Sequence, residues 1–434
     1  MDRTLQKKTS SFRYAIGMFG TSIPINMFKT YASAYYVMAR GATFEQMGIV
    51  LMIYAILDAI DNPVYGWFSD HTRTKWGRRR PWLVIGTPLL ILAFVLFFSA
   101  PASLGSGSTS LFVYMLLMYL LTGTLDSLIN ANYGALFPEL FKEDKKRTST
   151  NAMRQAFQLV AMAISIALTP MVTDKLGYQM TAVVYGALAL FVILFCAFGC
   201  HEDPENQELE KPKLLRTILD LAKNQKFWIF GLTNAFYGAA FSLIMQAIPF
   251  FSTYTLKVGS AQQTILMATV LGVALAGVGV WSFIVKKVPL LTAWRGTLLI
   301  MAVGFIPLFF ANSFIVVIAL VPIIAFGAAG AISTMDVIGA KIMDDDFERH
   351  GVHREGIIAS AMGVLGRLNG LYTGMVMIII EKVFGFVSGE QPGDMPDVAS
   401  RYMFIVFPFV AMLLSFLFSN FLRFNKRKGN EQNA

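Results

Sequence analysis

Long apolar stretches alternate with short polar segments along the whole chain. Each stretch has about 20 residues or more, the length of an α-helix that crosses the hydrocarbon core of a bilayer. The pattern predicts roughly twelve membrane-spanning helices, and so an all-α membrane protein. The expected ranges are 12–38, 44–69, 81–100, 110–136, 153–173, 178–200, 227–256, 262–285, 290–311, 313–340, 355–385 and 400–423.

The composition points to the same class. Hydrophobic residues make up 55% of the 434 residues and charged residues 15%. A water-soluble fold of this length would lack the polar side chains that its surface needs. The lipid bilayer is therefore the expected surrounding, with the cell membrane as the location. The sequence shows neither a nucleophile–base constellation nor a large soluble domain, so we do not expect an enzyme.

Basic residues gather in the polar segments before the first apolar stretch and after the second and fourth. The positive-inside rule places these segments, and with them both termini, in the cytoplasm. The formal net charge of +9 then reflects the topology of a membrane protein. No nucleic-acid partner is needed to explain it.

The longest polar stretch, 201–226, lies between the sixth and seventh expected spans. It predicts a bundle of six helices over 1–200, a cytoplasmic linker over 201–226 and a second six-helix bundle over 227–434. Two helical bundles that rock about a central site are the arrangement of many alternating-access carriers. We expect such a carrier to work as a monomer without a cofactor.

A polar motif follows the second span, where residues 66–82 read GWFSDHTRTKWGRRRPW. Gly66, Asp70 and Arg73 are followed by Gly77 and Arg78, which is typical of a tight cytoplasmic turn. An acidic side chain there can pair with a neighbouring cation or with the positive N-terminus of a facing helix, which favours one conformation. This motif resembles the signature of the major facilitator superfamily.

Two further segments narrow the resemblance. The second span carries Asp58-Ala-Ile-Asp61-Asn62-Pro63, and the segment before the eleventh span reads His353-Arg354-Glu355-Gly356. Both are similar to the glycoside–pentoside–hexuronide:cation symporters of the melibiose-carrier type. The resemblance covers essentially the whole chain. It implies a fold of two six-helix bundles and cation-coupled symport of a sugar or glycoside by alternating access. The alternatives are a carrier of acidic sugars and a carrier of another amphipathic solute, such as a lysolipid.

The resemblance also implies a coupling-ion site on the second span. Asp58 matches the first of two family aspartates, whereas Asn62 stands in place of the second. Asp61 is an additional carboxylate on the same helical face. A proton is the expected coupling ion, because replacing one aspartate weakens the negative charge that sodium requires. Asp61 could supply that charge, so sodium stays an alternative.

The substrate positions are partly changed. Ser22 and Asn130 stand where the family has aspartates that hold sugar hydroxyls, and Gly134 replaces a tryptophan. Arg154 and Arg367 match basic residues of the family's central polar region. Melibiose itself is therefore not the expected substrate.

Residues outside the family pattern complete the candidate substrate site. Lys29 and Asn26 share a face of the first span with Ser22, although Lys29 could instead reach the outer interface. Asp126 lies one turn before Asn130 on the same face of the fourth span. The expected substrate-binding residues are Ser22, Asn26, Lys29, Asp126, Asn130, Tyr133, Arg154, Arg367 and Tyr372, of which the two tyrosines are chosen by depth and polarity.

The cytoplasmic end of the tenth span carries three adjacent aspartates, Asp344 to Asp346. No histidine or cysteine lies at ligand spacing from them, so a charge lock that faces the basic loop after the second span is preferred to a metal site. The predicted conformational lock comprises Gly66, Asp70, Arg73, Gly77, Arg78, Asp344, Asp346 and Glu355.

Overall fold

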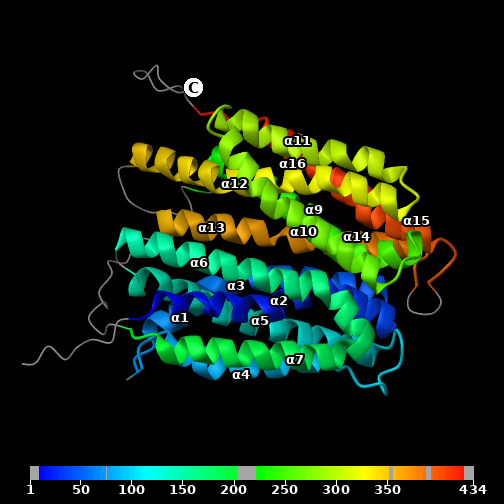
Figure 1. Ribbon diagram of the computed structural model, residues 1–434, viewed down its shortest axis with the longest axis horizontal. Helices are drawn as coiled ribbons and strands as arrows, with labels where there is room; N and C mark the ends of the chain where they lie inside the picture. The colour runs from blue at the N-terminus through cyan, green and yellow to red at the C-terminus, as the bar shows by residue number, and fades with distance from the viewer. Residues whose placement is uncertain are drawn as a thin grey trace, which may run out of the picture. The chain divides into compact units, whose positions relative to one another are not determined.

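The computed structural model describes residues 9–74, 76–141, 143–202, 221, 223–350, 355–387 and 392–424. All regular elements in these ranges are helices, and η marks a π-helical segment (Figure 1). The first group is α1 (Ser11–Ala15), α2 (Gly17–Ser33), η1 (Ala34–Ala39), α3 (Phe44–His71), α4 (Arg80–Phe97), α5 (Thr109–Leu140), α6 (Asp144–Met162), η2 (Ala163–Leu168) and α7 (Thr169–Gly199). The second group is α9 (Gln225–Phe250), η3 (Phe251–Thr255), α10 (Ser260–Ile284), α11 (Leu290–Phe309), α12 (Phe314–His350), α13 (Glu355–Arg367), α14 (Asn369–Phe384), α15 (Pro396–Arg401), η4 (Tyr402–Val406) and α16 (Phe407–Ser419).

The chain divides into two compact units. The first contains α1 to α7, and the second contains α9 to α16. Residues 203–220 of the expected linker lie outside the described residues. The linker therefore stays a prediction.

Within the described residues, nine helical stretches are long and apolar enough to cross a membrane. They are Arg80–Phe97, Thr109–Leu140, Lys145–Gly199, Gln225–Thr255, Ser260–Ile284, Leu290–Phe309, Phe314–Arg349, Ala361–Phe384 and Pro396–Ser419. The stretch Lys145–Gly199 covers two expected spans. They meet at a bend at Gly177, whose φ of 74° and ψ of 164° suit only glycine. The first two expected spans fall on α1 to η1 and on α3. The count of twelve stays a prediction.

In the first unit, α2 packs against α6 and α7, α4 packs against α5 and α7, and α3 packs against α5. A buried cluster joins Tyr14, Tyr133, Cys196 and Cys200. The two cysteines are free thiols whose Sγ atoms lie 3.9 Å apart. They contribute to packing, as small apolar side chains do.

The first span of each unit ends in the same way. In η1 the N–H of Arg40 donates to the carbonyl of Tyr35 at 3.0 Å, and in η3 the N–H of Leu256 donates to that of Phe251 at 2.9 Å. The next residue is left-handed in both units, with φ of 73° at Gly41 and 53° at Lys257. A new helix, α3 or α10, begins after the same interval. These helices are therefore equivalent positions of a structural repeat.

Candidate ion and substrate site

The seam between α3 and α5 brings together the acidic residues that the sequence singled out. A capping box of Thr43 and Gln46 starts α3, and Ser108 caps α5. Both helices are thus fixed at their first turn. Gly123 of α5 allows a close approach, since a Cβ there would lie 2.1 Å from the ring of Tyr54.

Two hydroxyl groups of α5 bind the two carboxylates of α3. Ser127 Oγ donates to Asp58 Oδ1 at 3.0 Å, and Thr124 Oγ1 donates to Asp61 Oδ2 at 3.1 Å. Asp58 is 8% exposed, whereas Asp61 is half-buried. The helix continues through Asn62, whose side chain lies outside the described residues, so its role stays a prediction.

Sequence reasoning missed Ser127 and Thr124. Each side chain is unremarkable in a membrane span, where hydroxyls bond readily to their own helix. Their spacing could have identified them, because Thr124 and Ser127 are three residues apart, as Asp58 and Asp61 are. This matching spacing becomes informative only when α3 and α5 are known to be neighbours.

A second polar pair lies further along α5. Asn130 Nδ2 donates to Asp126 Oδ1 at 2.7 Å, as the shared helical face suggested. Asp126 is 6% exposed. The carboxylate therefore orients the amide of Asn130, and together they offer both acceptors and donors to a hydroxyl-rich ligand.

The corresponding seam of the second unit is apolar. Counted from the first residue of α10, the positions of Asp58 and Asp61 are occupied by Ala274 and Gly277. A Cβ on Gly277 would lie 2.7 Å from the Cβ of Ala329 on α12. The repeated helix pair thus packs without carboxylates. The acidic residues of the first unit are not demanded by the fold, which marks them as functional candidates.

Arg154 of α6 lies against aromatic rings. Its guanidinium carbon is 4.8 Å from the ring centre of Phe137, 5.2 Å from Tyr133 and 5.6 Å from Tyr14. Its Nη2 has a weak contact of 3.9 Å with the sulfur of Met18, and its buried Nε has no hydrogen-bond partner among the described residues. Such a guanidinium retains donors for a ligand. Tyr133 contributes its ring, because its hydroxyl donates to the carbonyl of Tyr14.

The expected residues of α2 differ in exposure. Ser22 is buried, and Asn26 is half-buried with an amide nitrogen that has no partner among the described residues. Lys29 is exposed. Both interpretations of Lys29, a ligand contact and an interfacial cation, therefore stay open.

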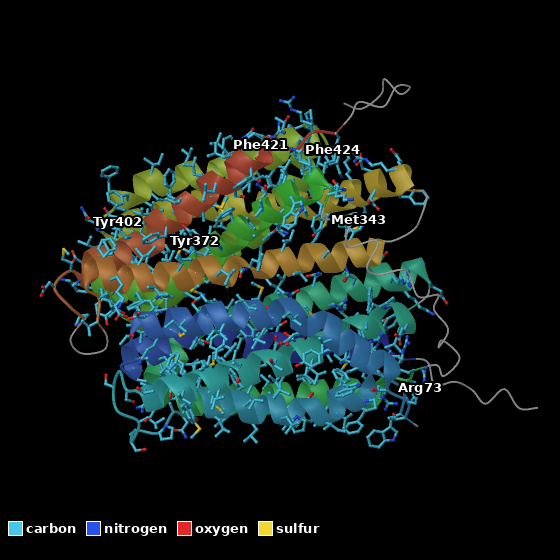
Figure 2. The ribbon with its side chains drawn as sticks, turned by 180° about the vertical axis from the view of Figure 1, so that it is seen from behind. Arg73, Met343, Tyr372, Tyr402, Phe421 and Phe424 are labelled. Carbon is cyan, nitrogen blue, oxygen red and sulfur yellow. The ribbon has the colours of Figure 1, made fainter. Side chains whose placement is uncertain are left out.

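The expected eleventh span, which lies in the second unit, tightens for one residue beside Arg367. This half-buried residue ends α13, Leu368 interrupts the helix and Asn369 begins α14. The N–H of Leu368 donates to Leu365 at 3.2 Å, a tighter turn than an α-helix makes. A short turn of this kind inside a helix often marks a hinge. Tyr372 (Figure 2) donates its hydroxyl to the carbonyl of Phe407 at 2.7 Å.

The basic loop after α3 binds partners within its own unit. Arg78 Nη2 pairs with Glu139 Oε1 at 2.6 Å, and the backbone N–H groups of Arg78 and Arg80 each donate to the Glu202 carboxylate at 2.8 Å. Gly77 has φ of 103°, and a Cβ there would lie 2.5 Å from this carboxylate. Sequence reasoning missed both glutamates. Arg73 is exposed (Figure 2).

The acidic end of α12 also has partners within its own unit. Asp345 pairs with Lys226 at 2.6 Å and with Arg349 at 2.9 Å, whereas Asp344 is exposed and Asp346 is buried. The predicted lock also includes Gly66, Asp70 and Glu355, whose side chains lie outside the described residues. A lock between the acidic run and the basic loop therefore stays a prediction.

Nine stretches long and apolar enough to span a bilayer, among the described residues, are those of a multi-pass membrane protein, and its buried carboxylates are candidates for an ion site. The model of the family described as MFS/sugar transport protein matches residues 13–426. The chain belongs to this family of the major facilitator superfamily, and its resemblance to the glycoside–pentoside–hexuronide type is confirmed.

Three relatives match this chain over almost its entire length. The isoprimeverose transporter of Lactiplantibacillus pentosus is 23% identical over 96% of this chain and 88% of its own length. The glucuronide carrier protein homolog of Escherichia coli is 23% identical over 96% and 93%. A putative sulfoquinovose importer of Salmonella typhimurium is 21% identical over 96% and 89%.

Solved structures share the fold. A crystal structure of the nucleoside transporter NupG matches with a TM-score of 0.72 at 14% identity, covering 95% of this chain and 99% of the other. A bacterial homologue of the lysosomal transporter Spinster matches with a TM-score of 0.67 at 15% identity, covering 94% and 95%. The fold is thus the major facilitator fold.

Proposed function

We propose that this protein is a proton-coupled symporter that carries a sugar or glycoside across the cell membrane by alternating access. The observation that carries the proposal is the Asp58–Ser127 hydrogen bond, in a seam whose counterpart in the second unit is apolar. A buried intramembrane carboxylate is costly and is typical of an ion pathway. The relatives' names, which include isoprimeverose, sulfoquinovose and glucuronide, support a sugar-like cargo. We further propose a monomer with both termini in the cytoplasm.

A proton suits the described seam better than sodium. Sodium binding requires several oxygen ligands and enough negative charge to offset its dehydration. Of the two carboxylates of α3, Asp58 is deeply buried and Asp61 is half-buried on the next turn, while the buried carboxylate of Asp126 on α5 accepts a hydrogen bond from Asn130. One carboxylate suffices to carry a proton. Asp58 is therefore the proposed proton carrier, and Asp61 is the residue to reassign if sodium drives transport.

An acidic sugar is a second candidate cargo. The observation that favours it is Arg154, which lies on three aromatic rings and forms no ion pair with another described residue. A guanidinium in such a place can bind a carboxylate or sulfonate with two hydrogen bonds, while the rings contact the sugar. A uronide or a sulfonated sugar would supply both groups.

Ligand binding to the purified protein distinguishes these cargoes. A ligand that binds only the folded state raises its melting temperature. We expect a rise with isoprimeverose or with phenyl glucuronide, and none with lysophosphatidylcholine. Arg154→Lys keeps the charge but loses the planar donor pair, so it should weaken the acidic ligand more than the neutral one. A rise with the lysolipid alone would contradict the proposal of a sugar carrier.

A further inference from the structure

Tyr54 occupies an unusual place in the α3–α5 seam. It lies one helical turn before Asp58 on the same face of α3 and is 6% exposed. Its hydroxyl lies beside Ser127 but makes no hydrogen bond of good geometry with any described residue. Asp58 and Asp126 are both close enough to act on this hydroxyl electrostatically. A buried donor is thus held next to two carboxylates.

The fold does not require a phenol at this position. The equivalent residue of α10 is Val270, which lines an apolar hollow in the second unit. In the first unit, Gly123 leaves room for the Tyr54 ring, and Tyr119 packs edge-on against it at 5.1 Å. These contacts hold the Tyr54 ring in a place where its hydroxyl has no good hydrogen-bond partner among the described residues. A buried donor without a partner costs free energy, unless a different protonation state of a neighbouring group gives it an acceptor.

We propose that Tyr54 is a positioning residue of the ion site, and that its hydroxyl donates a hydrogen bond to Asp58 when this carboxylate is ionised. The inference rests on the proposed function. When the coupling proton leaves Asp58, Tyr54 keeps its own proton and supplies a further donor in addition to Ser127. Donors to a carboxylate favour the charged form. Tyr54 therefore promotes release of the coupling proton.

Other titratable groups share this environment. In the first unit they are Asp61 on α3 itself, and Tyr119 and Asp126 on α5. None of them is altered when Tyr54 is replaced by phenylalanine. The variant therefore isolates the contribution of one hydroxyl.

The test is an infrared titration of carboxyl groups in the purified protein. The carboxyl band that is present in the wild type and missing in the Asp58→Asn variant belongs to Asp58. We expect Tyr54→Phe to move the midpoint of that band to higher pH by about one to two units, as loss of one donor to a charged group implies. A midpoint that coincides with that of the wild type, or an Asp58 that does not titrate, would overturn the inference.

The matched control is Tyr36→Phe. Tyr36 is also buried in the same unit, but its hydroxyl donates to the carbonyl of Phe97 at 2.9 Å. This variant loses a hydrogen bond and should leave the midpoint unchanged. If Tyr54→Phe fails to fold, Gly123→Ala displaces the ring without removing its hydroxyl and should move the midpoint in the same direction. The titration needs no substrate and therefore tests Tyr54 separately from the proposed function. Sodium-driven uptake would contradict proton coupling, whereas only the titration decides the role of Tyr54.

Discussion

Ser127 and Thr124 form a matched pair that can decide which carboxylate carries the coupling ion. They lie one turn apart on α5, and each donates one hydrogen bond to an aspartate of α3. Ser127→Ala removes one donor to Asp58, and Thr124→Val removes one donor to Asp61. Both changes delete a hydroxyl and leave the helix intact.

The expected costs differ because the two aspartates differ in burial. A buried hydrogen bond to a charged acceptor contributes about 1.5 to 3 kcal/mol, or roughly a ten- to hundredfold change in the ratio of ionised to neutral carboxylate. Water can replace the donor at half-buried Asp61, which limits that cost to about 0.5 to 1 kcal/mol, or roughly two- to fivefold. Ser127→Ala should therefore disturb the ion site far more than Thr124→Val.

The assay is the initial rate of sugar uptake into proteoliposomes under an inward proton gradient. We expect Ser127→Ala to lower the rate about tenfold or more, and Thr124→Val to lower it less than fivefold. Melting temperatures of both variants equal to that of the wild type would show that folding is unaffected. A larger loss in Thr124→Val would refute the assignment of Asp58 as the ion carrier.

Three further changes test other parts of the structure. Arg367→Ala should nearly abolish uptake and leave membrane insertion intact, because Arg367 is a half-buried cation inside an expected span, beside the tightened turn at Leu368. Surface labelling checks insertion, and normal uptake would contradict the role. Glu202→Ala leaves the backbone N–H donors at the start of α4 without their carboxylate and should lower the free energy of unfolding by about 2 kcal/mol. Glu202→Gln keeps an acceptor oxygen, so it should melt at a higher temperature than Glu202→Ala. Lys257→Gly should raise the melting temperature slightly. Glycine removes about 1 to 2 kcal/mol of backbone strain at this left-handed position, which exceeds the roughly 0.4 to 1 kcal/mol by which its greater freedom stabilises the unfolded chain. A lower melting temperature would argue against strain at Lys257.

The fold class was predictable because apolar length and charge distribution are local properties of the sequence. The acidic candidates were also within reach, since a carboxylate inside an apolar stretch stands out at once. The shared face of Asp126 and Asn130 followed from their spacing on one helix, and the structure adds the hydrogen bond between them. These predictions needed no knowledge of which helices are neighbours.

The remaining features depend on contacts between distant segments. Glu202 binds the backbone of Arg78 and Arg80, which lie more than a hundred residues earlier in the chain. No local sequence pattern predicts that contact. Tyr133 was selected for its hydroxyl, yet Tyr14 satisfies that group and the ring faces Arg154. Side-chain polarity identifies a candidate residue, but packing decides which of its atoms remains available.

The central claim is that a proton carried by Asp58 drives sugar uptake. Its most direct test is accumulation of labelled isoprimeverose or phenyl glucuronide in proteoliposomes under a pH gradient without sodium. The wild type should accumulate the sugar, Asp58→Asn should abolish accumulation, and Asp61→Asn should retain it. Accumulation that requires a sodium gradient at fixed pH, or that persists in Asp58→Asn, would contradict the account.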